Sequence, residues 1–413
     1  MLNPYKNNGI ILFVVAFFTL LVGFFLNEDV SGGGTSTDFY VTLSYVTDLK
    51  YSLFVSSEIT IHLPLHYILL SKIDYLVNDQ TILRFIFLLI SILVPFLFYL
   101  CLKIKFKSLS SNDALIISSL IFLFPSFRYS AIWANAHITA LIFFLLSSYF
   151  FLKIKIFSNL NINIYLNLFF LSLATYSRQY YALFFLYYLY FYYKNFKLLN
   201  FMYVVFYIFL LSIPGWILIY NNPQFLLGSS GSPMFSFKIY NSFLIISSIV
   251  LTYFIPLIFI ILLKNKNFLF KNSSFLIISA LISISIVLIS SIFFDYNFKV
   301  GGGVFAKASR YLFSNNLLFY LSSIFGFIII FYIAREHRDN LIILSIILFG
   351  FSGSYVLQKY FEPMFFMILY LYIKTNFYKY LLNMKFIFIS YLYYFFYYIA
   401  TLVNSFYKFS TSV

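Results

Sequence analysis

The chain has 413 residues, of which 62% are hydrophobic, 24% aromatic and only 9% charged. This composition, together with several apolar runs of about twenty residues, is typical of a polytopic helical membrane protein and excludes a soluble globular core. The formal net charge of +15 comes from lysines and arginines that stand singly or in small groups between the apolar runs. Such spacing indicates membrane orientation signals and not nucleic-acid binding.

The first apolar run, about residues 10–26, predicts an uncleaved membrane helix. Lys6 precedes the run, and no small-residue cleavage site follows it. The basic residue predicts a cytoplasmic amino end, so the segment after this helix should lie on the outer side of the membrane. The single cysteine, Cys101, lies in a later apolar run and excludes an intrachain disulfide and a thiolate metal cluster.

Residues 27–83 form the predicted first outer loop. Five of the twelve acidic residues of the chain lie in its first part, namely Glu28, Asp29, Asp38, Asp48 and Glu58. The part from 62 to 77 is apolar but short and is interrupted by Lys72 and Asp74, so it predicts a helix lying in the outer membrane interface. If this part spanned the membrane, every later basic cluster would fall outside, against the positive-inside rule.

The later apolar runs predict the remaining spans of an all-α membrane protein. They cover about residues 84–102, 114–152, 164–193, 199–220, 240–263, 275–293, 311–333, 341–356, 361–373 and 386–402. The second run is broken near residues 127–136, and the third is broken at residues 177–179. The sequence therefore predicts about twelve or thirteen transmembrane helices in a single integral membrane domain, residues 1–413.

The unusual polar residues gather on the predicted outer face, in the acidic loop, at Arg128, at residues 177–179, in a glycine-rich loop at 294–310 and at 358–362. The middles of the spans carry almost no charge, whereas an ion-coupled transporter needs ionisable groups near the middle of the membrane. A carboxylate that accepts a hydroxyl proton, beside cations that hold a phosphate, is the minimum for moving a sugar from a lipid phosphate to an alcohol. Asp38 supplies the carboxylate, and Arg178, Lys307 and Arg310 supply the cations.

The order of these elements resembles the GT-C glycosyltransferases, polytopic enzymes that use polyprenyl-phosphate-linked sugars and carry a catalytic acid in their first outer loop. The acid stands in Thr37–Phe39, and Ile61–Tyr67 is similar to the family's His-Pro-Pro-Leu or Leu-Pro-Gly-Leu-Tyr element, after which Arg84 opens the next span. The segment Tyr176–Tyr180 is similar to the Arg-Gln-Thr-Asn element of the lipid-linked alpha-1,2-glucosyltransferase branch. The segment Lys359–Pro363 is similar to the late Arg-Tyr-Tyr-x-x-Pro element of that branch.

The resemblance implies a role for three acids of the first outer loop. Asp38 is expected to be the general base on the acceptor hydroxyl, and its structural alternative is a solvated or helix-capping aspartate. The family's usual Asp-Glu pair directly after the first helix is here Glu28-Asp29. These two residues are the alternatives for the base, or ligands for a divalent cation with oxygen donors. No metal or other cofactor is assigned, and a divalent cation stays an open alternative.

Eight further residues are expected to bind substrate: His62, His66, Arg178, Gln179, Lys307, Arg310, Lys359 and Glu362. The two histidines are four residues apart and have a spacing that can hold zinc, but the Glu of H-E-x-x-H is missing, so contacts with a lipid phosphate or with the acceptor are preferred. Arg178 lies between two short apolar pieces and is expected to bind phosphate, with an interfacial anchor as the alternative. The Gly301–Gly303 amides offer a place for an anion, with a mobile external loop as the alternative.

The sequence thus predicts a membrane glycosyltransferase of hexosyltransferase type at the outer face of a bacterial inner membrane. Its expected partners are a polyprenyl-phosphate sugar donor, a lipid-linked or surface glycan acceptor and the lipid bilayer, and no nucleic acid. The resemblance alone implies that this enzyme inverts the configuration at the transferred sugar. Two other functions stay open at this point, an O-antigen or polysaccharide polymerase and a flippase or transporter of lipid-linked sugars.

Overall fold

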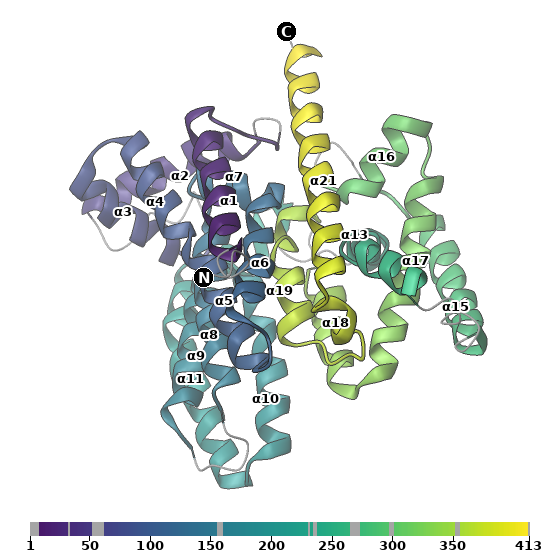
Figure 1. Cartoon of the computed structure of the whole chain (residues 1–413). Helices are drawn as coiled ribbons and strands as arrows, with labels where there is room; N and C mark the ends of the chain where they lie inside the picture. Colours follow the sequence, from purple (N-terminus) through teal and green to yellow (C-terminus); the bar gives the residue numbers. More distant parts are fainter. Residues whose placement is uncertain are drawn as a thin grey trace, which may run out of the picture. The chain divides into compact units, whose positions relative to one another are not determined.

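The computed structural model of the chain is helical and divides into two compact units (Figure 1). Unit 1 consists of Met1–Leu226 and Tyr391–Val413, and unit 2 of Leu227–Ser390. The structure describes residues 8–31, 34–51, 62–154, 160–229, 232–233, 238–264, 273–296, 301–351 and 356–411. Glu58, the side chain of Asp48 and residues 297–300 of the predicted glycine-rich loop lie outside the described part.

Unit 1 is built from short and medium helices that run antiparallel or cross at breaks. Its elements are α1 (Asn8–Phe25), α2 (Gly34–Tyr51), α3 (Leu65–Val77), α4 (Gln80–Ser91), α5 (Leu93–Lys105), α6 (Ser111–Ser119), η2 (Leu120–Leu123), α7 (Pro125–Ile132), α8 (Ala136–Leu152), α9 (Ile162–Ser177), η3 (Gln179–Leu183), α10 (Phe184–Asn195) and α11 (Leu198–Asn221). In Figure 1, α8, α9 and α11 lie side by side, and α8 and α9 pack along most of their length. The short α12 (Gln224–Leu227) follows α11.

Two predicted breaks in the apolar runs of unit 1 are confirmed, one by the turn at residues 133–135 and one by Arg178, and a further bend lies before the first of them. The pair α6–η2 and α7 is bent by 72°, and Pro125 stands at the first turn of α7, where its missing N–H costs nothing. Helix α7 ends at Ile132, and a turn of three residues leads to α8. Arg178 ends α9 in an extended conformation, with φ −150° and ψ 113°, before η3 begins. Both breaks place polar residues between short apolar pieces.

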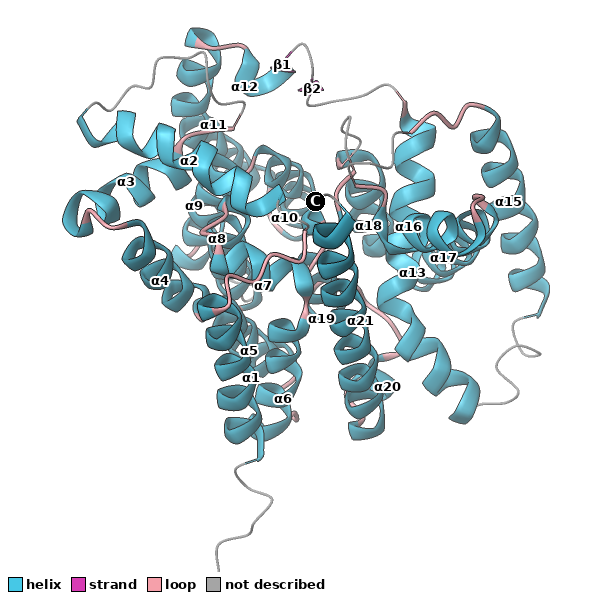
Figure 2. Ribbon diagram, turned by 90° about the horizontal axis from the view of Figure 1, so that it is seen from above, coloured by secondary structure: helices cyan, strands magenta, loops and turns pink. Residues whose placement is uncertain are grey.

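The predicted first outer loop contains two helices, α2 and α3. The prediction of a helix within residues 62–77 is confirmed by α3, and Pro64 is its N-cap residue. Thirteen residues of helix extend for about 20 Å, which is too short to cross a hydrocarbon core of about 30 Å. Tyr45 and Leu49 of α2 pack against Tyr67 of α3, with the two tyrosine ring centroids 5.3 Å apart. Figure 2 shows α2 and α3 as neighbours.

Unit 2 is centred on α13. Its elements are β1 (Gly228–Ser229), β2 (Ser232–Pro233), α13 (Ile239–Lys264), α15 (Ser273–Ile292), α16 (Gly303–Phe313), α17 (Leu317–Glu336), α18 (Arg338–Gly350), η4 (Gln358–Tyr360), α19 (Met364–Leu371), α20 (Tyr378–Leu381) and the start of α21 (Met384–Thr411). The two strands pair antiparallel over two residues each. A Cβ atom at Gly326 of α17 would lie 1.9 Å from the Ser247 carbonyl oxygen of α13, so this glycine lets the two helices approach closely.

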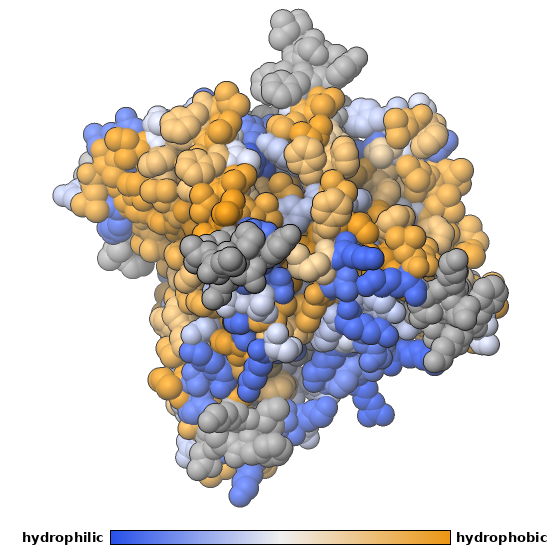
Figure 3. All heavy atoms as spheres, viewed as in Figure 1, coloured by the Kyte–Doolittle hydropathy of each residue, from blue (hydrophilic) through white to orange (hydrophobic). Residues whose placement is uncertain are grey.

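Seven helices among the described residues are long and apolar enough to cross a membrane, which indicates a multi-pass membrane protein. They are Asn8–Phe25, Gln80–Lys105, Leu198–Asn221, Ile239–Lys264, Ser273–Ile292, Leu317–Glu336 and Met384–Val403, and the bent pair at 111–132 makes an eighth if it is one span. Hydrophobic residues cover much of the surface visible in Figure 3.

The predicted count of twelve or thirteen spans is therefore too high for the described residues. The prediction took each broken piece as a separate span. Helices α10, α18 and α19 have only 12, 13 and 8 residues. At 1.5 Å per residue none of the three reaches about 30 Å. Helices α8 and α9, with 17 and 16 residues, are apolar but also fall short of the length of the seven.

Candidate functional site

The turn between α7 and α8, together with Ile132 at the end of α7, organises the polar interior of unit 1, and we call these residues the 132–135 turn. Ala134 in this turn has φ +47°, a left-handed conformation that costs a non-glycine residue free energy and needs support from its surroundings. The support comes from distant parts of the chain. Arg84 donates to the Ile132 carbonyl oxygen at 3.0 Å, and His66 Nε2 lies 3.0 Å from the Ala134 carbonyl oxygen. Arg178 donates to Asn135 Oδ1 at 3.2 Å.

Arg178 is a buried cation with neutral partners. Its side chain is only 7% exposed, and it donates to His62 Nε2 at 2.6 Å in addition to Asn135. Its Nε atom is buried without a hydrogen-bond partner, and no carboxylate among the described residues pairs with it. A guanidinium has five N–H donors, and burying it without a counter-charge is unfavourable. The site therefore has the donors and the uncompensated charge to bind an anion.

His62 extends this cluster through a chain of neutral hydrogen bonds. Because an arginine can only donate, His62 Nε2 is the acceptor, which leaves the proton on Nδ1. Nδ1 lies 3.4 Å from Gln179 Oε1, and the Gln179 amide donates to the Phe225 carbonyl oxygen at 3.2 Å. The structure thus brings together three residues that the sequence predicted as substrate-binding, His62, Arg178 and Gln179. Gln179 orients the ring of His62, and His62 orients the guanidinium.

His66, the fourth predicted residue in this region, is fully engaged. Its Nδ1 lies 2.8 Å from the Thr139 hydroxyl, and its Nε2 is the donor to the Ala134 carbonyl oxygen. Burial, with a smaller contribution from the Arg178 charge, lowers the pKa of His66 to about 3, although the bond to Ala134 opposes this shift. His66 is therefore neutral at physiological pH, and its bond to the Ala134 carbonyl oxygen supports the 132–135 turn.

Arg84 is a second buried arginine without a described carboxylate partner. It is 8% exposed, its guanidinium carbon lies 3.7 Å from the centroid of the Trp133 ring, and it also donates to Asn27 Oδ1 at 3.1 Å. One of its terminal nitrogens, Nη2, is buried without a hydrogen-bond partner among the described residues. The stacking on an indole face replaces part of the missing counter-charge. Arg84 was predicted only to begin a membrane span, and it was not among the predicted site residues.

Glu28 has a different environment, because it forms a buried ion pair with Arg128. Arg128 Nε donates to Glu28 Oε1 at 2.8 Å, and Arg128 Nη2 donates to Glu28 Oε2 at 2.6 Å. The other three N–H groups of Arg128 bond to Thr19 Oγ1, the Thr19 carbonyl and the Phe122 carbonyl. The Tyr398 hydroxyl also donates to Glu28 Oε2 at 2.8 Å. These contacts give Glu28 a structural role, in which it joins α1, α7 and the C-terminal helix.

Asp29 and Asp38 lie on either side of the start of α2. Asp29 accepts hydrogen bonds from the Ser31 backbone N–H at 2.9 Å, from the Ser31 hydroxyl and from the Ser36 N–H at 2.9 Å. These contacts make Asp29 a capping residue, since they satisfy backbone donors at the beginning of a helix. Asp38 is exposed on the surface of α2. Among the three predicted acids, it is the one that stands on an accessible helix face.

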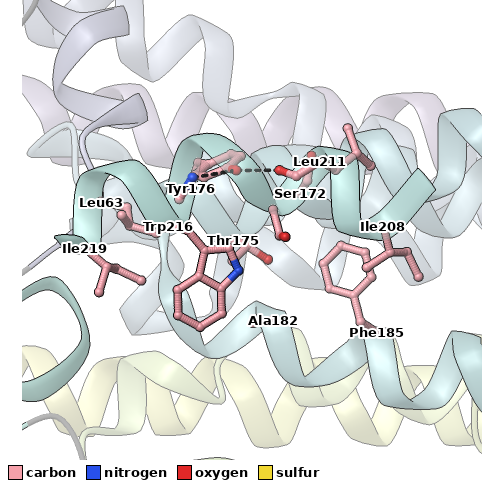
Figure 4. Close-up of a pocket in the computed structure, with 12 residues that line it drawn as sticks. Leu63, Ser172, Thr175, Tyr176, Ala182, Phe185, Ile208, Leu211, Trp216 and Ile219 are labelled. Carbon is pink, nitrogen blue, oxygen red and sulfur yellow. Dashed lines mark hydrogen bonds between the residues drawn. The ribbon is translucent and has the colours of Figure 1, made fainter. Parts of the chain in front are cut away.

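An apolar groove adjoins the Arg178 cluster. It has a volume of about 230 Å³ and is lined by residues of α9, η3, α10 and α11, together with Leu63, which follows His62 in the chain. Figure 4 shows Trp216 and Phe185 at its walls. Tyr176 and Ala182 line the groove and lie two residues before and four residues after Arg178. Arg178 itself does not line the groove, so the groove adjoins the segment of chain that carries the cation.

Helix α11 is locally opened beside this groove. Pro214 has no N–H to donate within the helix, and the Tyr176 hydroxyl inserts next to it. This hydroxyl accepts from the Gly215 N–H at 3.1 Å and donates to the Leu211 carbonyl at 2.5 Å, as the dashed lines in Figure 4 show. A Cβ atom at Gly215 would lie 3.2 Å from the Tyr176 ring, so glycine provides room for the insertion. The phenol thus holds α11 against α9.

Unit 2 contains the remaining predicted residues. All three glycines of Gly301–Gly303 have positive φ values, 80°, 86° and 78°. The Gly302 N–H donates to the Val356 carbonyl oxygen at 3.0 Å, so this amide is engaged within the protein. A Cβ atom at Gly303 would lie 3.5 Å from Gln358 Oε1, and the Gln358 amide lies 3.5 Å from Glu362 Oε2. The glycine-rich loop and the 358–362 segment are therefore neighbours within unit 2.

The side chains of these two segments differ in exposure. Glu362 is 2% exposed, and the Tyr253 hydroxyl lies 3.4 Å from its Oε2 atom. Lys307 on α16 and Lys359 in η4 are half-buried, whereas Arg310 at the end of α16 is exposed and donates to Asn316 Oδ1 at 3.4 Å. The assignment of these four residues to substrate binding stays a prediction.

The histidines and acids of the described residues do not gather at one point. No group of three or more His, Cys, Asp or Glu side chains in this part of the chain has an arrangement that could hold a metal ion. His62 uses its ring nitrogens for Arg178 and Gln179, and His66 uses its own for the Thr139 hydroxyl and the Ala134 carbonyl oxygen.

Comparisons with known proteins give no relative for this chain. No protein-family model matches it, no curated protein is detectably similar to it in sequence, and no solved structure is detectably similar in fold. The resemblance to GT-C glycosyltransferases accordingly stays a prediction from short motifs.

Rare residue types mark this region of unit 1 in the sequence. The chain has only four histidines and two tryptophans. Three of the histidines, His62, His66 and His137, and both tryptophans, Trp133 and Trp216, lie in or beside the cluster and the groove. Sequence reasoning missed Trp133, Asn135 and Trp216, although the scarcity of tryptophan was a usable signal.

Proposed function

We propose that this chain is a membrane glycosyltransferase that takes its sugar from a polyprenyl-phosphate donor. The observation that carries the proposal is the buried Arg178, which has unused donors and no described carboxylate partner, in a segment whose residues Tyr176 and Ala182 line an apolar groove. A lipid phosphate is the amphiphile that matches both features, with the phosphate at the guanidinium and the apolar chain along α11. Only two of the 24 residues of helix α11, Val204 and Gly215, are buried, so this side of unit 1 is suited to face lipid.

The phosphate would be bound by charge-assisted hydrogen bonds. The free N–H groups of Arg178 match the planar oxygens of a phosphate, and such bonds are about twice as strong as neutral ones. His62 and Asn135 hold the guanidinium in place, so its orientation is set before the lipid arrives. As the sugar leaves, negative charge grows on the phosphate, and a preorganised cation stabilises that charge.

Asp38 is the proposed general base. It precedes Phe39, whose ring centroid lies 6.1 Å from that of Trp133 in the turn that also carries Asn135. The acceptor hydroxyl would lose its proton to the Asp38 carboxylate while its oxygen forms a bond to the anomeric carbon of the sugar. The bond between this carbon and the phosphate oxygen breaks, and polyprenyl phosphate leaves. The acceptor would be a lipid-linked or surface glycan at the outer face of a bacterial inner membrane.

A transfer assay in membranes tests this proposal. Membranes that contain the chain are given a polyprenyl-phosphate donor with a radiolabelled sugar and a lipid-linked glycan acceptor. Label should appear in a new glycosidic product, and Arg178→Gln and Asp38→Asn should each lower the yield at least tenfold. Undiminished transfer by both variants would overturn the site. Movement of labelled donor across liposomes without a new glycosidic bond would instead indicate a transporter.

A further inference from the structure

Unit 2 contains a second apolar groove, which the proposed transferase reaction does not use. It has a volume of about 670 Å³ and lies between α13, α15 and α17. Leu262 of α13, Ala280 of α15 and Phe325 of α17 are among its lining residues, and only Ser273 and Tyr332 add polar side-chain atoms. This volume lies in the range of ligand pockets, about 300–1,000 Å³. Water would find few hydrogen-bond partners there, so the natural filling is apolar.

The dimensions of the groove fit one lipid chain in one leaflet. Its lining residues on α13 run from Phe254 to Leu262, which at 1.5 Å per residue is about 12 Å of helix. One leaflet contributes about 15 Å of hydrocarbon. The groove begins two residues before Lys264, the last residue of α13, and extends away from that helix end. The groove therefore runs from the charged end of α13 toward the middle of the membrane, over about the thickness of one leaflet.

Basic side chains stand at the edge where the groove begins. The Arg335 guanidinium carbon lies 4.5 Å from the centroid of the Phe275 ring, which in turn lies 6.2 Å from the ring of Tyr332. Arg335 and Lys264 are both exposed, and neither pairs with a carboxylate that the structure describes.

The acids near this edge have other contacts. Asp339 pairs with Lys374 at 2.6 Å, and Glu336 accepts from the Asn376 amide at 3.3 Å. Their presence does not cancel the cations, because Lys374 already balances Asp339, and the two cations Lys264 and Arg335 exceed the one remaining acid, Glu336. The edge of the groove is therefore net positive, as is typical of protein surfaces that contact anionic headgroups.

We propose that this groove binds an anionic diacyl phospholipid of the surrounding bilayer. One acyl chain lies between α13, α15 and α17, and the phosphate lies against Lys264 and Arg335. The lipid completes the packing of three helices that otherwise enclose a large apolar gap. This site does not depend on the glycosyltransferase function, because all of its residues belong to unit 2.

Native mass spectrometry of the full chain in detergent tests the proposal. Dioleoyl phosphatidylglycerol is titrated against dioleoyl phosphatidylcholine, and the bound fraction is measured at each concentration. Ala280→Phe fills the groove and should weaken phosphatidylglycerol binding at least tenfold. Ile278→Phe adds a similar ring on the exposed face of the same helix and should leave binding unchanged.

The headgroup contact is tested by a second pair of variants. Arg335→Gln should weaken phosphatidylglycerol binding about fivefold, the effect of one basic residue at an anionic surface, whereas Arg338→Gln at the same end should change it less than twofold. This pair keeps the test valid if Ala280→Phe does not fold. Equal binding of the two lipids, or binding that neither Ala280→Phe nor Arg335→Gln weakens, would overturn the proposal.

Discussion

Arg128 and Arg178 are both buried in unit 1, yet the structure surrounds them in opposite ways. Arg128 places all five of its N–H groups on protein acceptors, two of them on the Glu28 carboxylate. Arg178 bonds to two neutral side chains and keeps a buried nitrogen without a described partner. A saturated, charge-paired arginine has nothing left to offer a ligand. The unsaturated one has both charge and geometry available for an anion.

The largest effect is expected from Arg128→Gln. It would leave the Glu28 carboxylate buried without its counter-charge, and the loss of one partner from such a pair typically costs about 3–5 kcal/mol. Thermal and denaturant unfolding of the purified protein in detergent would measure this loss. The double variant Glu28→Gln with Arg128→Gln should be less destabilised than the single Arg128→Gln. If Arg128→Gln unfolds like the wild type, the pair does not hold α1 to α7.

Arg178→Gln is expected to separate binding from stability. Removing an uncompensated buried charge offsets the loss of the bonds to His62 and Asn135, so the free energy of unfolding should change far less than in Arg128→Gln. The loss of charge-assisted hydrogen bonds, each worth about 1.5–3 kcal/mol, should weaken binding of a polyprenyl phosphate by about ten- to a hundredfold. Binding of a fluorescent polyprenyl phosphate to the purified chain would measure this change.

Two further variants sharpen the Arg178 experiment. Arg178→Lys keeps the charge but loses the planar fork, so it should bind more weakly than the wild type and better than Arg178→Gln. Arg338→Gln changes an exposed arginine of unit 2 that is not among the predicted substrate-binding residues, and it serves as the matched control for loss of one positive charge. If Arg178→Gln destabilised the protein as strongly as Arg128→Gln is expected to, Arg178 would also be a structural residue. The contrast between a charge-paired and an anion-binding arginine would then be wrong.

Gly23→Ala tests how tightly the protein is packed around the ion pair between Glu28 and Arg128. A Cβ atom at this position would lie 2.4 Å from Glu28 Oε2 and 2.8 Å from Arg128 Nη2. Such overpacking typically costs about 1–3 kcal/mol, which thermal unfolding in detergent would reveal. Gly34→Ala is the control, since the nearest atom to its Cβ would be the Ser31 hydroxyl at 3.4 Å. Equal stability of the two variants would contradict a rigid ion pair.

The sequence predicted the local elements well where periodic apolar runs and helix breakers determine them. The first span, the break at Arg178 and the helix that begins after Pro64 were all foreseeable from composition and local rules. The number of spans was not, because an apolar run does not reveal whether a bent helix crosses the membrane once or twice. The length of each piece after bending decides this, and bending depends on tertiary contacts.

The site was predictable only in part, for a similar reason. His62, Arg178 and Gln179 were identified by motif, and they do contact one another. The role of Glu28 could not be read from its neighbours in sequence, since its partner is 100 residues away. The same holds for Tyr176, whose hydroxyl binds α11 beyond Pro214. Contacts between residues far apart in the sequence decide which charged groups have a partner, and a single sequence does not reveal these contacts.

The smallest expected effect is a pH dependence of stability that arises from His66 beside Arg178. The folded state lowers the pKa of His66 from 6.5 to about 3, mainly through burial, so the unfolded chain binds more protons between these values. Stability from this group is therefore complete above pH 6.5 and is lost as the pH falls toward 3. At pH 5.5 the loss relative to pH 8 should be about 1.4 kcal/mol.

His66→Gln isolates this contribution. A glutamine amide can still donate to the Ala134 carbonyl oxygen but does not titrate. The decrease in the free energy of unfolding from pH 8 to pH 5.5 should therefore be smaller in this variant by about 1.4 kcal/mol. Comparison of the slopes in wild type and His66→Gln removes the effects of all other groups. An unchanged slope would mean that His66 is protonated in the folded protein, and a charged His66 would compete with Arg178 for the same anion. The neutral His66 thus leaves Arg178 as the cation of the cluster.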